Sequence, residues 1–292
     1  MTPHLESAGY RPWKGKLRSP WWGSLAIVRV ALNLIMRRWL FWILLGLGLM
    51  NFLYHFAFIY LKATIVVQNR DFARFMDSFK LTGTGQAYLN FMHLQAAIAA
   101  LLLAFAGSLL IGTDSRHGGM IFYLSRSMNR VHYIVGKFLS IAVVVTLITT
   151  VPALILYCEY GFLSTSFDYF TENWRIAVGI IGFGLVLATV QSLMLFAVAV
   201  WVPRTVPLAM TWLGLFVLLT ALGRALKEMA GERRWMLLAL WEDMLRVGHW
   251  AFGSLPENRS PTGTETVIVL VGVCLLSLAL IIYRVKAVEV VR

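Results

Sequence analysis

Six long apolar stretches constrain the fold of this chain more than any other feature of its sequence. Each has at least 17 residues and contains no Asp, Glu, Lys or Arg. A helix needs about 20 mostly apolar residues to cross a membrane, because every backbone polar group in the span must be hydrogen-bonded internally. The stretches are 39–61, 91–112, 138–158, 176–202, 206–222 and 267–283. The sequence therefore predicts an all-α integral membrane protein with six transmembrane helices.

Composition and two proline positions refine this prediction. Charged residues make up only 14% of the chain and hydrophobic residues 59%, which excludes a disordered chain and an ordinary soluble enzyme. Pro152 predicts a kink in the third span, because proline cannot donate the helical hydrogen bond. The connection 203–205 is so short that we expect spans four and five to form a tight antiparallel hairpin.

The distribution of charge predicts the orientation. With six spans the two termini share one side, and that side carries fifteen of the 26 Lys and Arg but only three of the 14 acidic residues. The whole net charge of +12 therefore falls on one side, and basic loops remain cytoplasmic. We expect a multi-pass protein of the cytoplasmic (inner) membrane with both termini inside and an uncleaved first span. No nucleic-acid partner is needed to explain the basicity.

The segments outside the spans are expected to divide into three kinds. Residues 1–20 are polar and basic and predict a cytoplasmic tail, whereas 39–292 form the six-span domain. In 21–38, Leu25, Val28, Leu32 and Ile35 recur at helical spacing, which predicts an amphipathic interfacial helix ahead of span one. A plain extension of span one is the alternative. Short outer helices are expected in 223–265, between spans five and six.

The segment from Asp114 to Lys137 is too long and too patterned for a simple turn between spans two and three. It reads DSRHGGMIFYLSRSMNRVHYIVGK. An apolar anchor with a charged border is typical of a docking surface. The anchor comprises Phe122, Tyr123 and Leu124, and the border Arg116, Arg126 and Arg130. The alternative is an ordinary positive-inside loop that carries an interfacial helix.

This segment resembles the loop after the second span in permease subunits of ABC transporters of the type-2 exporter class. The family pattern has an acidic residue near the end of span two, a glycine, a leucine-rich segment, Ser-Arg-Pro, an arginine, and Gly-Lys at the start of span three. The chain departs from it at Ser127, where the family usually has proline. The matching residues are Asp114, Gly119, Tyr123, Leu124, Ser125, Arg126, Arg130, Tyr133, Gly136 and Lys137.

The resemblance implies that the loop is a coupling helix seated in a separate ATPase subunit. Two ATPase copies would assemble with this permease and a second, identical or related, permease copy. The chain has no Walker A motif, so ATP would be bound by the partner, and we expect neither enzymatic activity nor a cofactor or metal in this chain. ATP hydrolysis would drive export or conformational work, with an outer-face partner protein as a further expectation. The implied coupling residues are Asp114, Arg116, Gly119, Phe122, Tyr123, Leu124, Arg126, Arg130 and Lys137, the last at the membrane boundary.

Polar residues within the spans are candidates for a translocation path. Asn51 and His55 lie one helical turn apart in span one, and Gln191 lies in the middle of span four. The alternative is that these groups make hydrogen bonds between packed helices. Two other functions also remain open: a non-transporting membrane anchor or assembly subunit, and an intramembrane enzyme. The enzyme is disfavoured because the spans contain no carboxylate between their ends.

Overall fold

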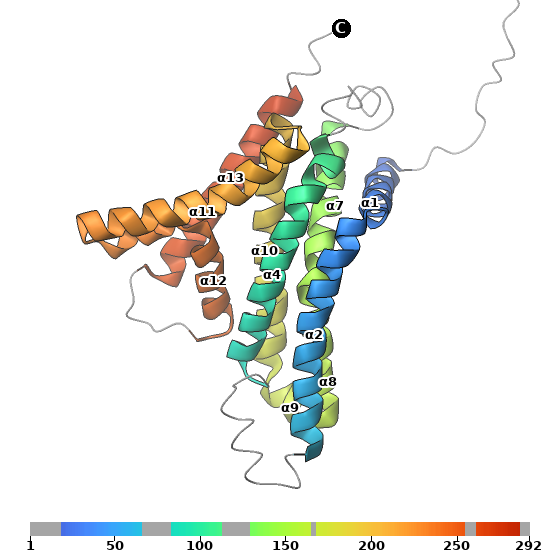
Figure 1. Cartoon of the computed structure of the whole chain (residues 1–292), viewed down its shortest axis with the longest axis vertical. Coiled ribbons are helices and arrows are strands. Elements are labelled where there is room, and N and C mark those ends of the chain that lie inside the picture. The colour runs from blue at the N-terminus through green and yellow to red at the C-terminus, as the bar shows by residue number, and fades with distance from the viewer. Residues whose placement is uncertain (1–18, 66–82, 113–128, 165–167, 255–260, 287–292) are drawn as a thin grey trace, which may run out of the picture.

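The computed structural model describes residues 19–65, 83–112, 129–164, 168–254 and 261–286. These residues form helices and the connections between them, without any strand (Figure 1). In chain order the elements are α1 (Pro20–Met36), α2 (Trp39–Ile65), α4 (Gly85–Gly107), the π-helical turn η1 (Ser108–Gly112), α7 (Arg130–Ile148), α8 (Thr150–Leu163), α9 (Asp168–Glu172), α10 (Trp174–Trp201), α11 (Thr205–Ala230), the 3₁₀ turn η2 (Arg233–Leu238), α12 (Leu240–Ala251) and α13 (Gly263–Lys286).

The prediction of six membrane-spanning helices is confirmed. Six segments within the described residues are long and apolar enough to cross a membrane: Trp39–Lys62, Gly85–Ile111, Arg130–Leu163, Trp174–Trp201, Thr205–Ala230 and Gly263–Val285. Short helices, η2 and α12, lie between the fifth and sixth of these, as expected. The protein is therefore an all-α, multi-pass membrane protein.

The third span is interrupted where the sequence predicted a kink. It consists of α7 and α8, which are separated at Thr149, three residues before Pro152. The proline ring would clash with the carbonyl four residues earlier, and that residue is Ile148, the last of α7. The Thr149 hydroxyl donates to the carbonyl of Val145 at 2.8 Å, which satisfies one backbone acceptor at the break.

Two helices form the centre of the bundle and three lie at its periphery. Buried residues make up 72% of the most apolar windows of α4 and α10, but only 22% of those of α2, α11 and α13. Close approach at the centre depends on glycine, because a Cβ on Gly184 of α10 would overlap Thr150 Oγ1 of α8. The peripheral helices are apolar as well, so their outer faces are suited to contact with lipid.

The fourth and fifth spans differ from the predicted hairpin. Their connection is indeed short, but α11 leaves the bundle and runs outward across it (Figure 1). The first half of α11 packs on α4 instead, where Trp212 Nε1 donates to the carbonyl of Ala100 at 2.9 Å. Its second half packs against η2, since a Cβ on Gly223 would lie 2.9 Å from the Trp235 carbonyl oxygen. These contacts with α4 and η2 set the direction of α11, although its connection to α10 is short.

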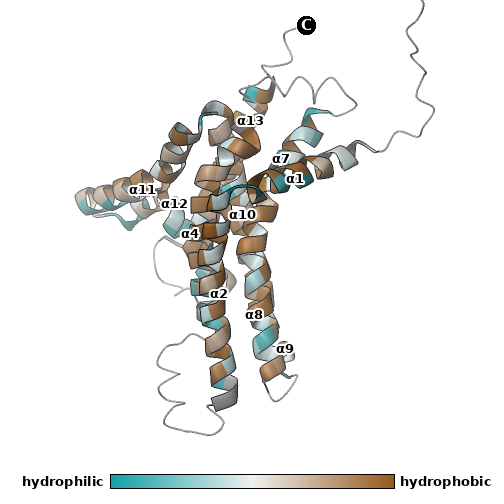
Figure 2. Cartoon of the chain, turned by 45° about the vertical axis from the view of Figure 1, so that its right-hand side comes forward, coloured by the Kyte–Doolittle hydropathy of each residue, from teal (hydrophilic) through white to brown (hydrophobic). Residues whose placement is uncertain are grey.

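The N-terminal helix is separate from the first span rather than an extension of it. In Figure 1 α1 is viewed almost along its axis, whereas α2 runs down the bundle. The chain turns at Arg37 and Arg38, and Trp42 Nε1 donates to the carbonyl of Met36 at 2.9 Å, which closes the turn. Figure 2 shows polar and apolar residues mixed on α1, in contrast to the largely apolar spans. This geometry favours the amphipathic helix over the plain extension.

Candidate functional site

Most of the predicted coupling residues lie outside the described part of the chain. These are Asp114, Arg116, Gly119, Phe122, Tyr123, Leu124 and Arg126. The structure does describe Arg130, Lys137 and the two helical ends from which the loop leaves and to which it returns. The site can therefore be built from its base, where α4 ends and α7 begins.

The helix that leads into the loop ends in a π-helical turn. Helix α4 changes at Ser108 into η1, which ends at Gly112, the last described residue before the loop. Such turns are rare and frequently mark functional positions, because one extra residue per turn displaces the carbonyls from their regular partners. The Leu110 carbonyl in η1 accepts a hydrogen bond from a side chain on another helix.

That partner is Lys137, which lies on α7 two turns after the loop. Its side chain is only 5% exposed, and Nζ donates to the Leu110 carbonyl. The ammonium also lies 5.8 Å from the centre of the Tyr133 ring. A buried ammonium is costly without such partners, so this contact holds the two ends of the loop together. The lysine is enclosed between helices rather than exposed at a boundary.

Helix α1 packs on the start of α7 beside this contact. Ser24 Oγ donates to the His132 carbonyl at 2.8 Å, and the Trp21 and His132 rings meet edge to face at 4.6 Å. Gly136 permits the approach, because a Cβ there would lie 3.0 Å from Ile27 Cδ1 and 3.2 Å from the Ser24 carbonyl oxygen. The N-terminal helix is therefore fastened to the returning end of the loop.

Helix α11 contacts the end of the loop at η1, where the chain leaves α4. The hydroxyls of Ser108 in η1 and Thr205 at the start of α11 are 2.8 Å apart and share a hydrogen bond. We call this set of contacts, made by Ser24, Ser108, Leu110, His132, Gly136, Lys137 and Thr205, the loop base. The loop base therefore connects α1, α4, α7 and α11 at the two ends of the loop.

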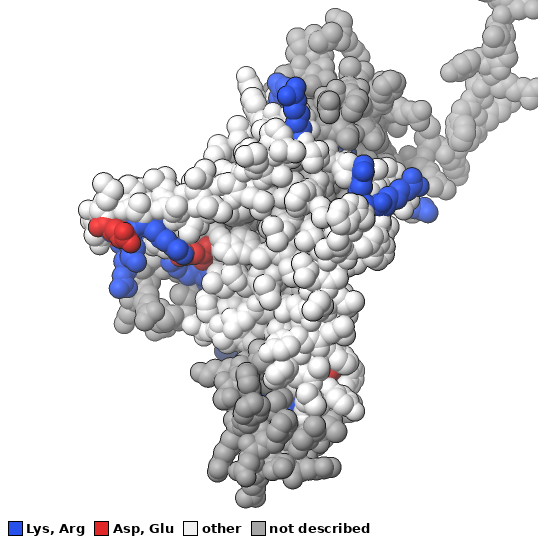
Figure 3. All heavy atoms as spheres, in the orientation of Figure 1, with Lys and Arg blue, Asp and Glu red and all other residues white. Residues whose placement is uncertain are grey.

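The charge around the loop base follows the predicted asymmetry. On the face shown in Figure 3, basic atoms but no acidic ones are visible at the end of the molecule that carries α1 and the end of α13. Acidic and basic atoms are mixed at the other charged region, around the end of α11.

The polar residues of the first span make contacts within the bundle. His55 is buried, its Nδ1 lies 3.0 Å from the Asn51 carbonyl oxygen, and its ring meets Phe91 of α4 edge to face at 5.0 Å. The Asn51 amide nitrogen is buried without a hydrogen-bond partner. Both residues therefore lie at the contact between α2 and α4.

Gln191 has a similar place at the contact between α10 and α4. It is fully buried, and Nε2 donates to the Ala96 carbonyl at 3.4 Å. Gln95, its near neighbour on α4, donates in turn to the Gly48 carbonyl of α2 at 2.9 Å. These contacts favour the packing alternative for His55 and Gln191, whereas the side-chain amide nitrogen of Asn51 has no hydrogen-bond partner among the described residues. Their role in a translocation path stays a prediction.

The structure also forms a polar pocket that the sequence did not reveal. It has a volume of about 380 Å³ and opens where α11 leaves α4, with α12 as its third wall. His93 contributes from α4 and faces the Trp241 ring at 5.1 Å. The remaining lining comprises Thr220, Arg224, Glu242, Leu245, Arg246 and His249. Alternating charged and apolar residues in 235–246 were the only signal, and they gave no indication of the partner helices.

Both arginines of this outer pocket are already paired. Arg224 Nη2 lies 2.7 Å from Glu242 Oε1, and Arg246 Nη1 lies 3.1 Å from Asp243 Oδ1. Burial raises the pKa of Asp243 to about 7, although Arg246 opposes this. Each guanidinium of the pocket therefore lies beside a carboxyl group. Within the described residues, no three His, Cys, Asp or Glu side chains are grouped to hold a metal ion.

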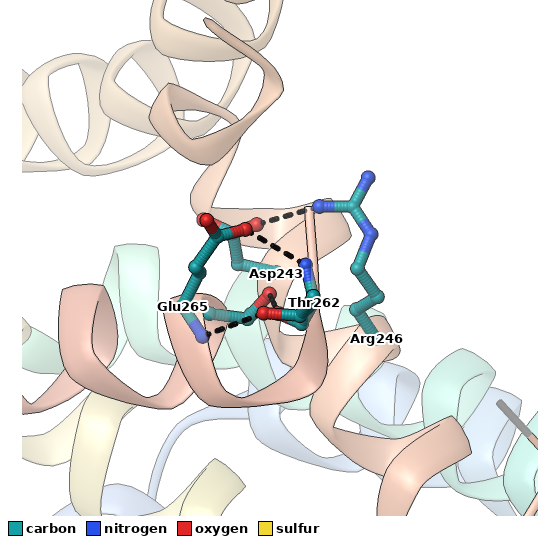
Figure 4. Close-up of polar contacts among 5 residues, drawn as sticks. Asp243, Arg246, Thr262 and Glu265 are labelled. Atoms are coloured by element: carbon teal, nitrogen blue, oxygen red, sulfur yellow. Dashed lines mark hydrogen bonds and ion pairs between the residues drawn. The ribbon is translucent and has the colours of Figure 1, made fainter. Parts of the chain in front are cut away.

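The start of the last span is fixed close to the Asp243–Arg246 pair (Figure 4). Thr262 and Glu265 form a capping box, in which the Thr262 amide donates to Glu265 Oε2 at 2.9 Å and the Glu265 amide donates to Thr262 Oγ1 at 3.3 Å. Arg234 of η2 lies 3.6 Å from Glu265 Oε1 as well. This region joins η2, α12 and α13 into one structural unit.

Comparison with known proteins adds no assignment to this geometry. No protein-family model matches the chain, and no curated protein matches it.

Proposed function

We propose that this chain is the transmembrane permease subunit of an ABC transporter, driven by a separate ATPase subunit. Six spans, the loop pattern from Asp114 to Lys137 and the absence of a nucleotide-binding motif in the sequence all support this proposal. The observation that carries it is the loop base. A loop that only connected two spans would not need its two ends joined through a buried lysine and fastened to two further helices.

The loop base gives the proposed coupling a mechanical route. An ATPase subunit bound to the anchor residues Phe122, Tyr123 and Leu124 would displace the loop when the ATPase changes conformation on binding or hydrolysing ATP. Because Lys137 and Leu110 join the ends of the loop, such a displacement moves α4 and α7 as one body. Contacts at Ser24 and Thr205 pass the movement to α1 and α11, whose outer faces are free to move in lipid.

The remaining parts of the assembly follow from the same proposal. Two ATPase copies would act on this chain and on a second permease copy, and the work would be export or a conformational change across the cytoplasmic membrane. Both termini and the loop would lie on the cytoplasmic side, where the excess of Lys and Arg is found.

Co-purification tests the proposal. The tagged chain, expressed with a candidate ABC ATPase subunit from the same organism, should retain that ATPase after solubilisation. The double variant Tyr123→Ala/Arg126→Ala should lose the ATPase while still inserting into the membrane. A matched control is Tyr10→Ala/Arg11→Ala, which removes the same two side-chain types from the N-terminal tail. Equal recovery of the ATPase with both double variants, or none with the unmodified chain, would overturn the docking role.

A further inference from the structure

A crevice lies at the elbow between α1 and α2, on the side of the bundle that faces α4. It has a volume of about 300 Å³. Arg38, in the turn between the two helices, and Thr205 are its polar lining residues, and the remaining walls are apolar. We call it the elbow crevice; the wall residues used below are Trp39, Leu44, Leu102, Phe105 and Ala106.

The crevice runs from the interfacial helix into the spans. Leu44 lies about one and a half turns beyond Arg38 on α2, and Leu102 and Phe105 lie in the last two turns of α4. Phe105 is 44% exposed although it lies in a span, so its ring borders both the crevice and the surrounding lipid. The crevice is therefore open to the membrane and not only to water.

Tryptophans fix the depth at which the crevice opens. Trp39 and Trp42 are both exposed at the start of α2, and the Trp42 indole donates to the Met36 carbonyl. Tryptophan is enriched at the level of lipid headgroups, where one end of the ring system is apolar and the other is hydrated. Arg38 lies between these markers and the end of α1, at headgroup depth.

The charge of Arg38 is not neutralised by the described chain. Its backbone is fixed, since its amide donates to the Ile35 carbonyl at 2.9 Å, but its guanidinium has no hydrogen-bond or ion-pair partner among the described residues. No acidic side chain lines the crevice, and Arg37 adjoins it. A guanidinium above an apolar slot complements a phosphate that carries an acyl chain.

We infer that the elbow crevice binds an anionic glycerophospholipid, with its phosphate at Arg38 and one acyl chain against Leu44, Leu102 and Phe105. A free phosphate would make no use of the apolar walls, and a zwitterionic lipid brings a positive group towards a basic elbow. The inference does not depend on the proposed transport function, because it needs only a membrane around the spans. The bound lipid would secure the elbow from which α1 reaches the loop base.

Lipid titration of the purified chain, followed by native mass spectrometry, tests this inference. Dioleoyl phosphatidylglycerol should bind more tightly than dioleoyl phosphatidylcholine, and excess inorganic phosphate should not displace it. Arg38→Gln should weaken binding of the anionic lipid roughly fivefold, as expected for one basic residue at an anionic surface. Arg37→Gln is the matched control, since it removes the same charge from the adjacent exposed position and lies outside the crevice.

The acyl-chain contact has its own pair of variants. Phe105→Ala should weaken binding of the dioleoyl lipid but not of dihexanoyl phosphatidylglycerol, whereas Leu101→Ala, an exposed residue of the same helix outside the crevice, should change neither. If Arg38→Gln fails to fold, the comparison of Phe105→Ala with Leu101→Ala still tests the inference. Equal binding of the two headgroups, equal losses for Arg37→Gln and Arg38→Gln, or displacement by phosphate alone would overturn the inference.

Discussion

Substitution of Gly136 by leucine should detach α1 from the loop base. A Cβ at this position would lie 3.0 Å from Ile27 Cδ1, 3.3 Å from Ile27 Cβ and 3.2 Å from the Ser24 carbonyl oxygen. The last two atoms belong to or adjoin the backbone of α1, so they cannot move aside unless the helix shifts. Leucine adds three further carbon atoms in the same direction, and the whole helix must separate from α7.

The size of the effect follows from the cost of overpacking. Extra methylene groups in a well-packed contact cost about 1–3 kcal/mol. Since each 1.4 kcal/mol changes an equilibrium tenfold, the ratio of docked to undocked α1 should fall roughly 5- to 150-fold. Under the proposed function, the same variant should retain the ATPase but stimulate its hydrolysis less.

Thiol labelling measures this docking equilibrium. The chain has only two cysteines, Cys158 and Cys274, so a cysteine-free background is within reach. Ser24 is 2% exposed, and Ser24→Cys should react slowly with a maleimide while α1 is docked and much faster in the Gly136→Leu variant.

Gly46→Leu provides the control for the labelling experiment. It places the same side chain on a spanning helix, at a position where an added Cβ meets nothing within 4 Å. The reasoning is refuted if Ser24→Cys reacts at the same rate in the Gly136→Leu variant, the Gly46→Leu variant and the parent chain.

Two further predictions concern stability, each measured by thermal unfolding in detergent. Trp212→Ala should cost about 3–5 kcal/mol because it empties a fully buried site, whereas Trp212→Phe, which loses mainly the bond to Ala100, should cost about 1 kcal/mol; equal losses would contradict this. Burial raises the pKa of Asp243 from 3.8 to about 7, so the folded chain holds this proton more tightly than the unfolded chain. Stability should therefore fall between pH 4 and pH 7, and Asp243→Asn should flatten that dependence; an unchanged profile would refute it.

The six spans and the break near Pro152 could be predicted because each depends on a single stretch of sequence. Hydropathy over about 20 residues decides whether a segment can cross a membrane, whatever its neighbours are. The proline acts on a carbonyl only four residues away, at Ile148. Likewise the capping box at Thr262 and Glu265 lies within one helical turn. Features with such local causes can be predicted from the sequence without a structure.

The direction of α11 was predicted wrongly for the opposite reason. A short connection limits where the next helix starts but not where it points. The direction is set by Trp212 on α4 and by Gly223 against η2, and these contacts join residues far apart in the chain. The outer pocket exists only because α11 diverges there, so sequence reasoning missed it too.

The sequence by itself determined that this chain is a six-span helical membrane protein, since length and hydropathy are properties of each segment alone. It also predicts that the excess positive charge lies on one side of those spans. Only the tertiary structure decided that Lys137 joins the two ends of the loop, that α1 packs on α7, and that Arg38, which has no ion-pair partner among the described residues, borders a mostly apolar crevice. Each of those features depends on which side chains of different helices meet, and no single segment carries that information.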